Sequence, residues 1–330
     1  MSLTATVKEF LERHRVIRRP AMDGVAGQEP GVRGAVAAVT QTDCAQSPYP
    51  LPAMPVLARE ILGLTQEPDA RPARLASLVE RDPAVAELVA GWARLPLPGQ
   101  AQEPVASLDQ AIAMLGPAAP HITLGFVAGK SLRIPSEGPI GLHACWRHAV
   151  YSAALARALA QALPDPRRPE VGLVHLAGLL HNCGFLLLGH LFQPEFYLLN
   201  KLVCAKTKTQ VTTLERHILC MGRAQRLVGM GHAQMGAGLM RAWNMPEAVT
   251  VAVGEHHNAD YRGPHRAYAH VVLIADRLLK RCGIGDAADG GLPPQVTAAL
   301  GLTEERAAQA LERVLENGAV LDTLARQAAA

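Results

Sequence analysis

The chain has 330 residues, of which 49% are hydrophobic and only 4% are aromatic. This composition can bury a large core, and the shortage of aromatic residues favours packed helices over sheets. The formal net charge is +3, with 32 Lys and Arg residues against 29 Asp and Glu residues. That balance argues against a nucleic-acid-binding surface.

The sequence predicts mainly helices, in the following order. Residues 3–15 predict a short helix, and the Gly/Pro/Gln-rich stretch 19–55 predicts a linker or a poorly ordered arm. From about Leu51 the apolar residues recur at helical spacing, and no convincing alternating strand is present. Helices are predicted over residues 55–64, 71–80, 83–95, 107–115, 117–133, 140–162, 168–181, 194–221, 228–243, 246–257 and 265–282.

The tail, residues 286–330, begins with a Gly/Pro loop, after which a helix is predicted from the capping residue Thr303. The six cysteines form no CxxC pair, so neither a zinc ribbon nor a disulfide framework is predicted. Residues 1–20 lack the apolar run of a signal peptide. The most apolar stretch, 176–192, is short for a membrane span and is interrupted by polar residues. We therefore expect a cytoplasmic, soluble protein that contacts neither membranes nor nucleic acid.

Several ionisable residues lie on the apolar stripes of successive predicted helices, which places them on the core side. They are His148, His181, His232, His256, His257 and Asp276. Burying an unpaired carboxylate costs several kcal/mol, so Asp276 needs a partner. A single histidine on an apolar face is usually a hydrogen-bonded core residue. Several of them beside a buried aspartate leave two interpretations open. They form either a metal centre or a polar network that remains after metal binding has been lost.

The order of these residues, His148, then His181-Asn182, then Asp276, resembles the HD superfamily of metal-dependent phosphohydrolases. In that superfamily a paired His-Asp binds metal, and the Asp commonly bridges two ions. Further segments occur in the order seen in HDOD domains, the HD-related output domains of bacterial signalling. These segments are 51–55, 80–83, 107–116, 177–181, 231–237 with Trp243 and Pro246, and 256–257. The resemblance covers roughly residues 50–285.

What the resemblance implies is an all-α, HD-domain-like multi-helix bundle with an additional N-terminal helical subdomain. The expected division is 1–50 as an N-terminal helix and arm, 51–285 as the HDOD domain, and 286–330 as a C-terminal helical tail. Within the HDOD domain, 51–135 would form the N-terminal helical part and 136–285 the HD-like core. The expected metal-ligand set, taken as degenerate or partial, is His148, His181, Asn182, His232, His256, His257 and Asp276.

The sequence departs from the superfamily pattern at the residue that matters most for charge. Asn182 stands in place of the paired Asp, Asn258 follows the double histidine where related phosphodiesterases have Glu, and the loop 260–264 lacks their Gly-Tyr-Pro tripeptide. A neutral amide cannot offset the charge of two divalent ions. We therefore expect a weakened two-metal centre, with no bound metal or a single divalent ion held by His148, His181 and Asp276.

The function predicted from these features is a non-catalytic signal-transduction module that acts by binding. We expect signalling protein partners, with a small regulatory ligand or self-association as further options. The alternative is a metal-dependent phosphohydrolase acting on a nucleotide or cyclic dinucleotide. The surviving histidines and Asp276 favour that alternative, and Asn182 disfavours it.

Overall fold

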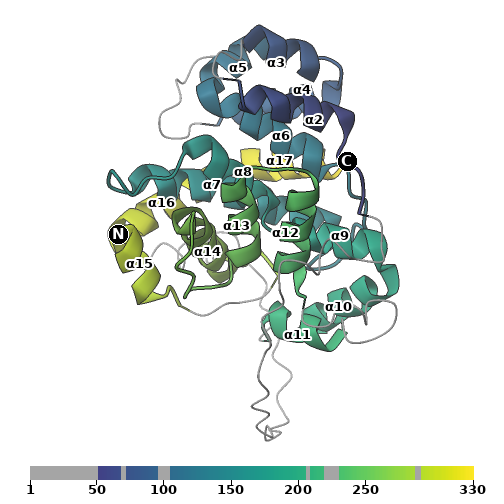
Figure 1. Cartoon of the computed structure of the whole chain (residues 1–330), viewed down its shortest axis with the longest axis vertical. Coiled ribbons are helices and arrows are strands. Elements are labelled where there is room, and N and C mark those ends of the chain that lie inside the picture. The colour runs from purple at the N-terminus through teal and green to yellow at the C-terminus, as the bar shows by residue number, and fades with distance from the viewer. Residues whose placement is uncertain (1–50, 68–71, 96–104, 206–208, 219–229, 287–290) are drawn as a thin grey trace, which may run out of the picture.

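A computed structural model of the chain describes residues 51–330 except 68–71, 96–104, 206–208, 219–229 and 287–290 (Figure 1). The described part is entirely helical and contains no strand, which confirms the predicted all-α class. The predicted helix at residues 3–15 and the arm that follows it lie outside the described residues, apart from the last few residues of the arm.

The N-terminal helices form a lobe at the top of Figure 1. They are α2 (Val56–Thr65), α3 (Pro72–Val79), α4 (Pro83–Ala93) and α5 (Leu108–Leu115), followed by the 3-10 turn η1 (Gly116–Ala118) and α6 (Ala119–Gly129). Local signals set their ends. The Asp82 carboxylate accepts from the Ala84 and Val85 N–H groups, and the Ser107 hydroxyl accepts from the Gln110 N–H. Gly116 ends α5 with a φ of 58°.

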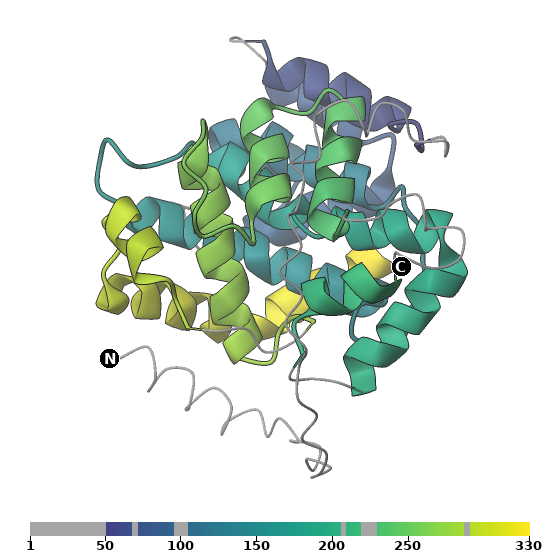
Figure 2. The ribbon, with the colours of Figure 1, turned by 60° about the horizontal axis from the view of Figure 1, so that its bottom comes forward.

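The remaining helices form the larger body below this lobe (Figures 1 and 2). In chain order they are α7 (Leu142–Ala162), α8 (Val171–Leu180), α9 (Cys183–Leu191), α10 (Gln193–Ala205), α11 (Val211–Ile218), α12 (His232–Ala242), α13 (Glu247–Glu255) and α14 (Arg266–Arg281). The tail adds α15 (Pro294–Leu300), α16 (Glu304–Glu316) and α17 (Gly318–Ala329). Helix α7 packs against α8, α14, α16 and α17, while α17 also contacts α4 and so joins the tail to the lobe.

Two predictions of helix boundaries were wrong. The single helix predicted over 194–221 is two helices, α10 and α11. No helix was predicted between residues 181 and 194, yet α9 follows α8 almost at once. The residues of α9 are apolar on nearly every side and are almost all buried. A helix buried all round has no amphipathic period, so periodicity could not mark it.

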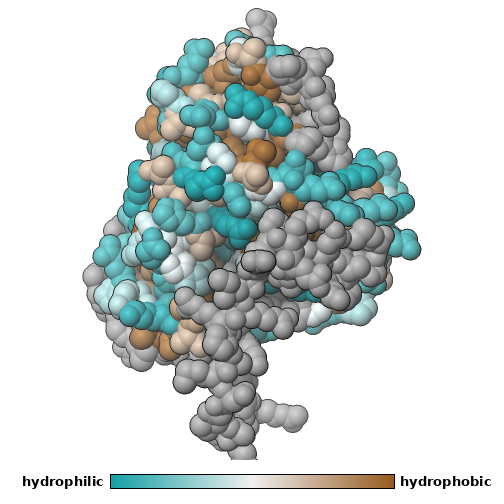
Figure 3. All heavy atoms as spheres, turned by 180° about the vertical axis from the view of Figure 1, so that it is seen from behind, coloured by the Kyte–Doolittle hydropathy of each residue, from teal (hydrophilic) through white to brown (hydrophobic). Residues whose placement is uncertain are grey.

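Two stretches, Leu108–Gly129 and Val171–Leu191, are apolar and long enough to cross a membrane by composition. In the folded chain 72% and 89% of their most apolar windows are buried against other helices. Burial in the core therefore accounts for their apolar character. On the outside, the view from behind shows hydrophobic patches mainly on the N-terminal lobe and mostly hydrophilic residues below it (Figure 3).

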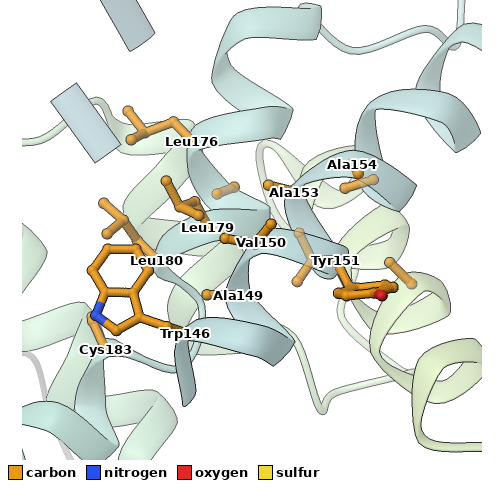
Figure 4. Packing of buried hydrophobic residues seen from close by; sticks show 14 of the residues in the cluster. Trp146, Ala149, Val150, Tyr151, Ala153, Ala154, Leu176, Leu179, Leu180 and Cys183 are labelled. Carbon is orange, nitrogen blue, oxygen red and sulfur yellow. The ribbon is translucent and has the colours of Figure 1, made fainter. Parts of the chain in front are cut away.

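The packing of α7 on α8 positions the polar cluster described below. Figure 4 shows Trp146, Val150 and Ala153 of α7 against Leu176, Leu179 and Leu180 of α8. Gly178 allows the two helices to approach closely, because a Cβ there would lie 2.8 Å from the Ser152 carbonyl oxygen. Residues near the C-terminal end of α8 are therefore held directly against the middle of α7.

Candidate metal centre

The structure brings all seven residues of the predicted ligand set into one buried region. Most of them lie at helix ends, where a side chain can turn toward a neighbouring helix. His181 and Asn182 follow α8, His232 begins α12, and His256 and His257 follow α13; His148 and Asp276 lie within α7 and α14. Metal ligation by these residues stays a prediction, but their convergence is a property of the fold.

Four of these residues form one side of the cluster. The Nε2 atom of His148 lies 3.2 Å from Asp276 Oδ1, and the Nε2 atom of His181 lies 3.9 Å from the same oxygen. We call His148, His181 and Asp276 the Asp276 triad; its ligand atoms lie within 4.8 Å of one another. Asn182 adjoins it through its Nδ2 atom, which donates to His148 Nδ1 across 3.0 Å.

Asp276 has the buried positive partner that the sequence analysis expected but did not identify. Lys280, one turn further along α14, places its Nζ atom 3.0 Å from Asp276 Oδ2 and 2.7 Å from Asp286 Oδ1. Burial by itself would raise the pKa of Asp276, but Lys280 and His148 hold it well below its ordinary value. Burial would lower the pKa of Lys280, and the two carboxylates outweigh that effect and raise it. The three groups therefore form a buried charged bridge.

Three imidazoles form the other side of the cluster, which we call the histidine triad. The Nε2 atom of His232 lies 3.2 Å from the Nε2 atom of His256 and 3.1 Å from that of His257. Hydrogen-bond acceptors hold the opposite nitrogen of two of these rings. His256 Nδ1 donates to the Val253 carbonyl across 2.7 Å, and His232 Nδ1 donates to the buried Glu215 carboxylate at 2.9 and 3.0 Å.

The electrostatics favour the neutral form of three of these rings. Burial lowers the pKa of His256 well below its ordinary value, and the neighbouring imidazoles lower it further. Burial and then Lys280 lower the pKa of His257, and burial lowers the pKa of His181. Neutral imidazole is the form that binds divalent metals. These three rings are therefore in the form that can ligate a divalent ion.

The two triads adjoin each other, since the rings of His181 and His256 lie edge to face with centroids 5.0 Å apart. Tight backbone contacts fix this arrangement. A Cβ on Gly184 at the start of α9 would lie 1.8 Å from the His232 carbonyl oxygen, so only glycine lets α9 and α12 pack this closely. Each triad therefore brings its ligand atoms together between helix ends whose relative positions are fixed by the core.

Sequence reasoning missed three members of the cluster, Glu215, Lys280 and Asp286. Lys280 carried a usable signal, because a lysine four residues after a buried aspartate lies on the same helix face. Glu215 lies 17 residues before His232 in the sequence, and Asp286 lies in a loop after α14. Glu215 shares the buried stripe of α11 with Val211, Leu214 and Ile218, so its periodicity offered a signal that was overlooked, whereas the loop residue Asp286 has no such pattern.

Comparison with known proteins agrees with this architecture. The HDOD domain family profile matches residues 51–259. A provisionally named signal transduction protein of Marinobacter aquaeolei VT8 is 29% identical to this chain, with a TM-score of 0.71. The match covers 85% of this chain and 60% of that protein. This chain thus spans 60% of the length of that relative.

Two further solved structures share the fold at lower identity. An HDOD domain protein with unknown function from Geobacter sulfurreducens is 22% identical, with a TM-score of 0.66 over 84% of this chain and 94% of that one. A provisionally named metal-dependent phosphohydrolase of Shewanella amazonensis SB2B is 16% identical, with a TM-score of 0.52. That match covers 83% of this chain and 95% of the other. A search of curated proteins found no match. With the profile covering more than half of its length, the chain belongs to the HDOD family.

Proposed function

We propose that this protein is a regulatory module of bacterial signal transduction that works by binding and hydrolyses no phosphodiester efficiently. The observation that carries the proposal is the position of Asn182, whose amide contacts His148 at the edge of the Asp276 triad. A carboxylate there could bridge two cations and support a hydroxide between them, whereas a neutral amide offers one carbonyl oxygen at most.

The charge of Lys280 supports the same proposal. Its ammonium lies 3.0 Å from Asp276 Oδ2, so part of the negative charge that a pair of cations would need is already neutralised. A second cation beside this ammonium would be repelled in a region with little water. The Marinobacter relative is named for signal transduction, and we extend that role to this chain, with a protein partner, a small ligand or a second copy as the bound species in the cytoplasm.

The alternative, a metal-dependent phosphohydrolase, is favoured by one observation. Within each triad the ligand atoms lie within 4.8 Å of one another, which is a spacing that allows them to surround an ion. If an ion were bound, it would supply Lewis acidity and an activated water molecule, and the chain's own histidines would hold it. The missing carboxylate at residue 182 is the reason that we rank this function second.

The two functions can be separated by an activity measurement. Wild-type protein, Asn182→Asp and Asp276→Asn would each be loaded with manganese, iron, zinc or nickel and assayed with bis(p-nitrophenyl) phosphate. We expect the wild type to show no more turnover than Asp276→Asn. Metal-dependent hydrolysis by the wild type at a rate comparable with that of Asn182→Asp would contradict the proposal.

A further inference from the structure

A cavity between the C-terminal end of α7 and the tail helix α16 is lined by arginines. The two helices pack side by side (Figure 1), and the cavity has a volume of about 410 Å³. Ligand pockets in proteins measure roughly 300–1,000 Å³, so a small molecule fits here. The polar residues of the wall are Gln161, Arg168, Arg306, Gln309 and Arg313, and no carboxylate of the described residues lines it.

The sequence of α16 concentrates positive charge at this cavity. Arg306, Gln309 and Arg313 recur at spacings of three and four residues, so they share one face of the helix, and that face lines the cavity. Glu305 and Glu312 each come one residue before an arginine, about 100° around the helix, and neither lines the cavity. Three arginines therefore face one cavity in a chain whose net charge is only +3.

The end of α7 holds two of these guanidinium groups in place. Arg306 Nη1 donates to the Ala162 carbonyl across 3.2 Å, and Arg168 Nη2 donates to the Leu163 carbonyl across 3.1 Å. These bonds satisfy carbonyl groups at a helix end and offset the negative end of the helix dipole. The Asp165 carboxylate lies 3.8 Å from Arg168 Nε and is exposed, so it screens that charge only weakly. A guanidinium has five N–H groups, so most donors of both side chains are left for a ligand.

Two further arginines carry charge that the fold does not neutralise. The Arg313 guanidinium has no hydrogen-bond or ion-pair partner among the described residues. Arg157, one helical turn before Gln161, is 5% exposed, and its Nε and Nη1 atoms have no hydrogen-bond partner in the described part of the chain. Residues four apart on a helix are neighbours, so this buried charge lies behind the cavity wall at Gln161. Little water screens it there, and it attracts an anion into the cavity.

We propose that this cavity binds a small molecule that carries phosphate groups, with Arg306 and Arg313 as its principal contacts and Arg168 at its edge. The planar guanidinium pairs with two phosphate oxygens at once. A phosphate group carries a charge of about −1.5 to −2 at pH 7, so one phosphate balances two arginines, whereas one carboxylate balances only one.

This site goes beyond the proposed function and is separate from the metal-centre candidates. His148 precedes Ala158 by ten residues on α7, which is about 15 Å along the helix axis. Helix α16, which supplies half of the polar contacts, also lies outside the residues 51–259 that match the HDOD profile. The tail therefore adds a ligand site to the HDOD domain.

The experiment is isothermal titration calorimetry of the full chain with pyrophosphate, at constant ionic strength and with a chelator present so that no metal ion carries the ligand. We expect saturable binding of one pyrophosphate per chain. Arg313→Gln breaks no contact within the fold and should weaken binding roughly tenfold or more, and Arg306→Gln/Arg313→Gln should abolish it. Arg133→Gln/Arg241→Gln removes the same charge at exposed positions elsewhere and should leave the Kd unchanged.

Citrate, whose carboxylates carry a similar total charge, should bind more weakly than pyrophosphate. The inference is overturned by no binding of pyrophosphate, or by equal losses of affinity in the two double variants, which would trace binding to net charge. It is also overturned by citrate binding as tightly as pyrophosphate, or by loss of pyrophosphate binding in Asp276→Asn. None of these results changes the outcome of the phosphodiester assay, so each would leave the proposed function standing.

Discussion

Lys280 lies one helical turn after Asp276 on α14 and places its ammonium 3.0 Å from the Asp276 carboxylate in a region closed to solvent. The side chains are 4% and 1% exposed, respectively. The same ammonium reaches Asp286 at 2.7 Å, so one cation serves two buried carboxylates. This bridge connects α14 to the loop that follows it. The Lys280 ammonium balances the charge of the Asp276 carboxylate, as a bound metal ion would.

Replacing Lys280 by methionine should strongly destabilise the fold. The substitution keeps an unbranched side chain that is one atom shorter but leaves two buried carboxylates without a counter-charge, which costs about 3–5 kcal/mol. Chemical denaturation followed by circular dichroism would measure the loss in the free energy of unfolding. Lys201→Met, at an exposed position of α10, is the matched control and should leave the transition midpoint unchanged. An unchanged midpoint for Lys280→Met would show that the bridge contributes no stability.

If the predicted ligand set holds a divalent ion, Glu215→Gln should weaken its binding at His232 without removing a ligand. Glu215 accepts from both the backbone N–H and the Nδ1 atom of His232, and such partners typically change metal affinity by about 10–100-fold. Competition with a chromophoric chelator would give the dissociation constant for Zn²⁺. Glu255→Gln, whose carboxylate accepts from nearby Asn258, is the control. Equal affinities for the two variants would argue against a role for Glu215 in orienting His232.

Gly184→Ala should disrupt the contact between α9 and α12. The added Cβ would lie 1.8 Å from the His232 carbonyl oxygen, and backbone on both sides prevents an easy adjustment. Overpacking of this kind costs about 1–3 kcal/mol or more. Gly63→Ala on α2 meets nothing within 4 Å and should instead stabilise by roughly 0.5–1 kcal/mol, because alanine has the higher helix propensity. Thermal unfolding of the two variants should therefore shift in opposite directions.

Tyr151→Phe should loosen the attachment of the C-terminal helix α17. The Tyr151 hydroxyl lies 3.0 Å from the Gly318 carbonyl and 3.1 Å from Asp322 Oδ1, and a single hydroxyl proton can satisfy only one of them at a time. Loss of this contact should cost about 1–2 kcal/mol. Hydrogen exchange of the α17 amides is the direct measurement, with exposed Tyr197→Phe as the control. Faster exchange in α17 for Tyr197→Phe than for Tyr151→Phe would contradict the prediction.

Helix ends marked by local chemistry were predictable, and uniformly apolar segments were not. The helix at 107–115 was predicted within one residue, since Ser107 and Gly116 act on their own neighbours. Helix α9 was missed because nearly all its faces are buried. The break between α10 and α11 was missed as well. A period of 3.6 residues reports one buried face against one exposed face, and α9 lacks that contrast. Helices α10 and α11 each have a buried and an exposed face, so the helical pattern continued through both of them.

The sequence by itself determined the helical class and the seven residues that meet in the core, because periodicity marks buried polar side chains and the family resemblance adds Asn182. Only the tertiary structure decided how those residues divide into two triads and which partners hold each ring. Glu215, Lys280 and Asp286 reach the cluster from three different segments. The position of a proton on an imidazole depends on atoms a few ångströms away in space, and spacing along the chain does not report them.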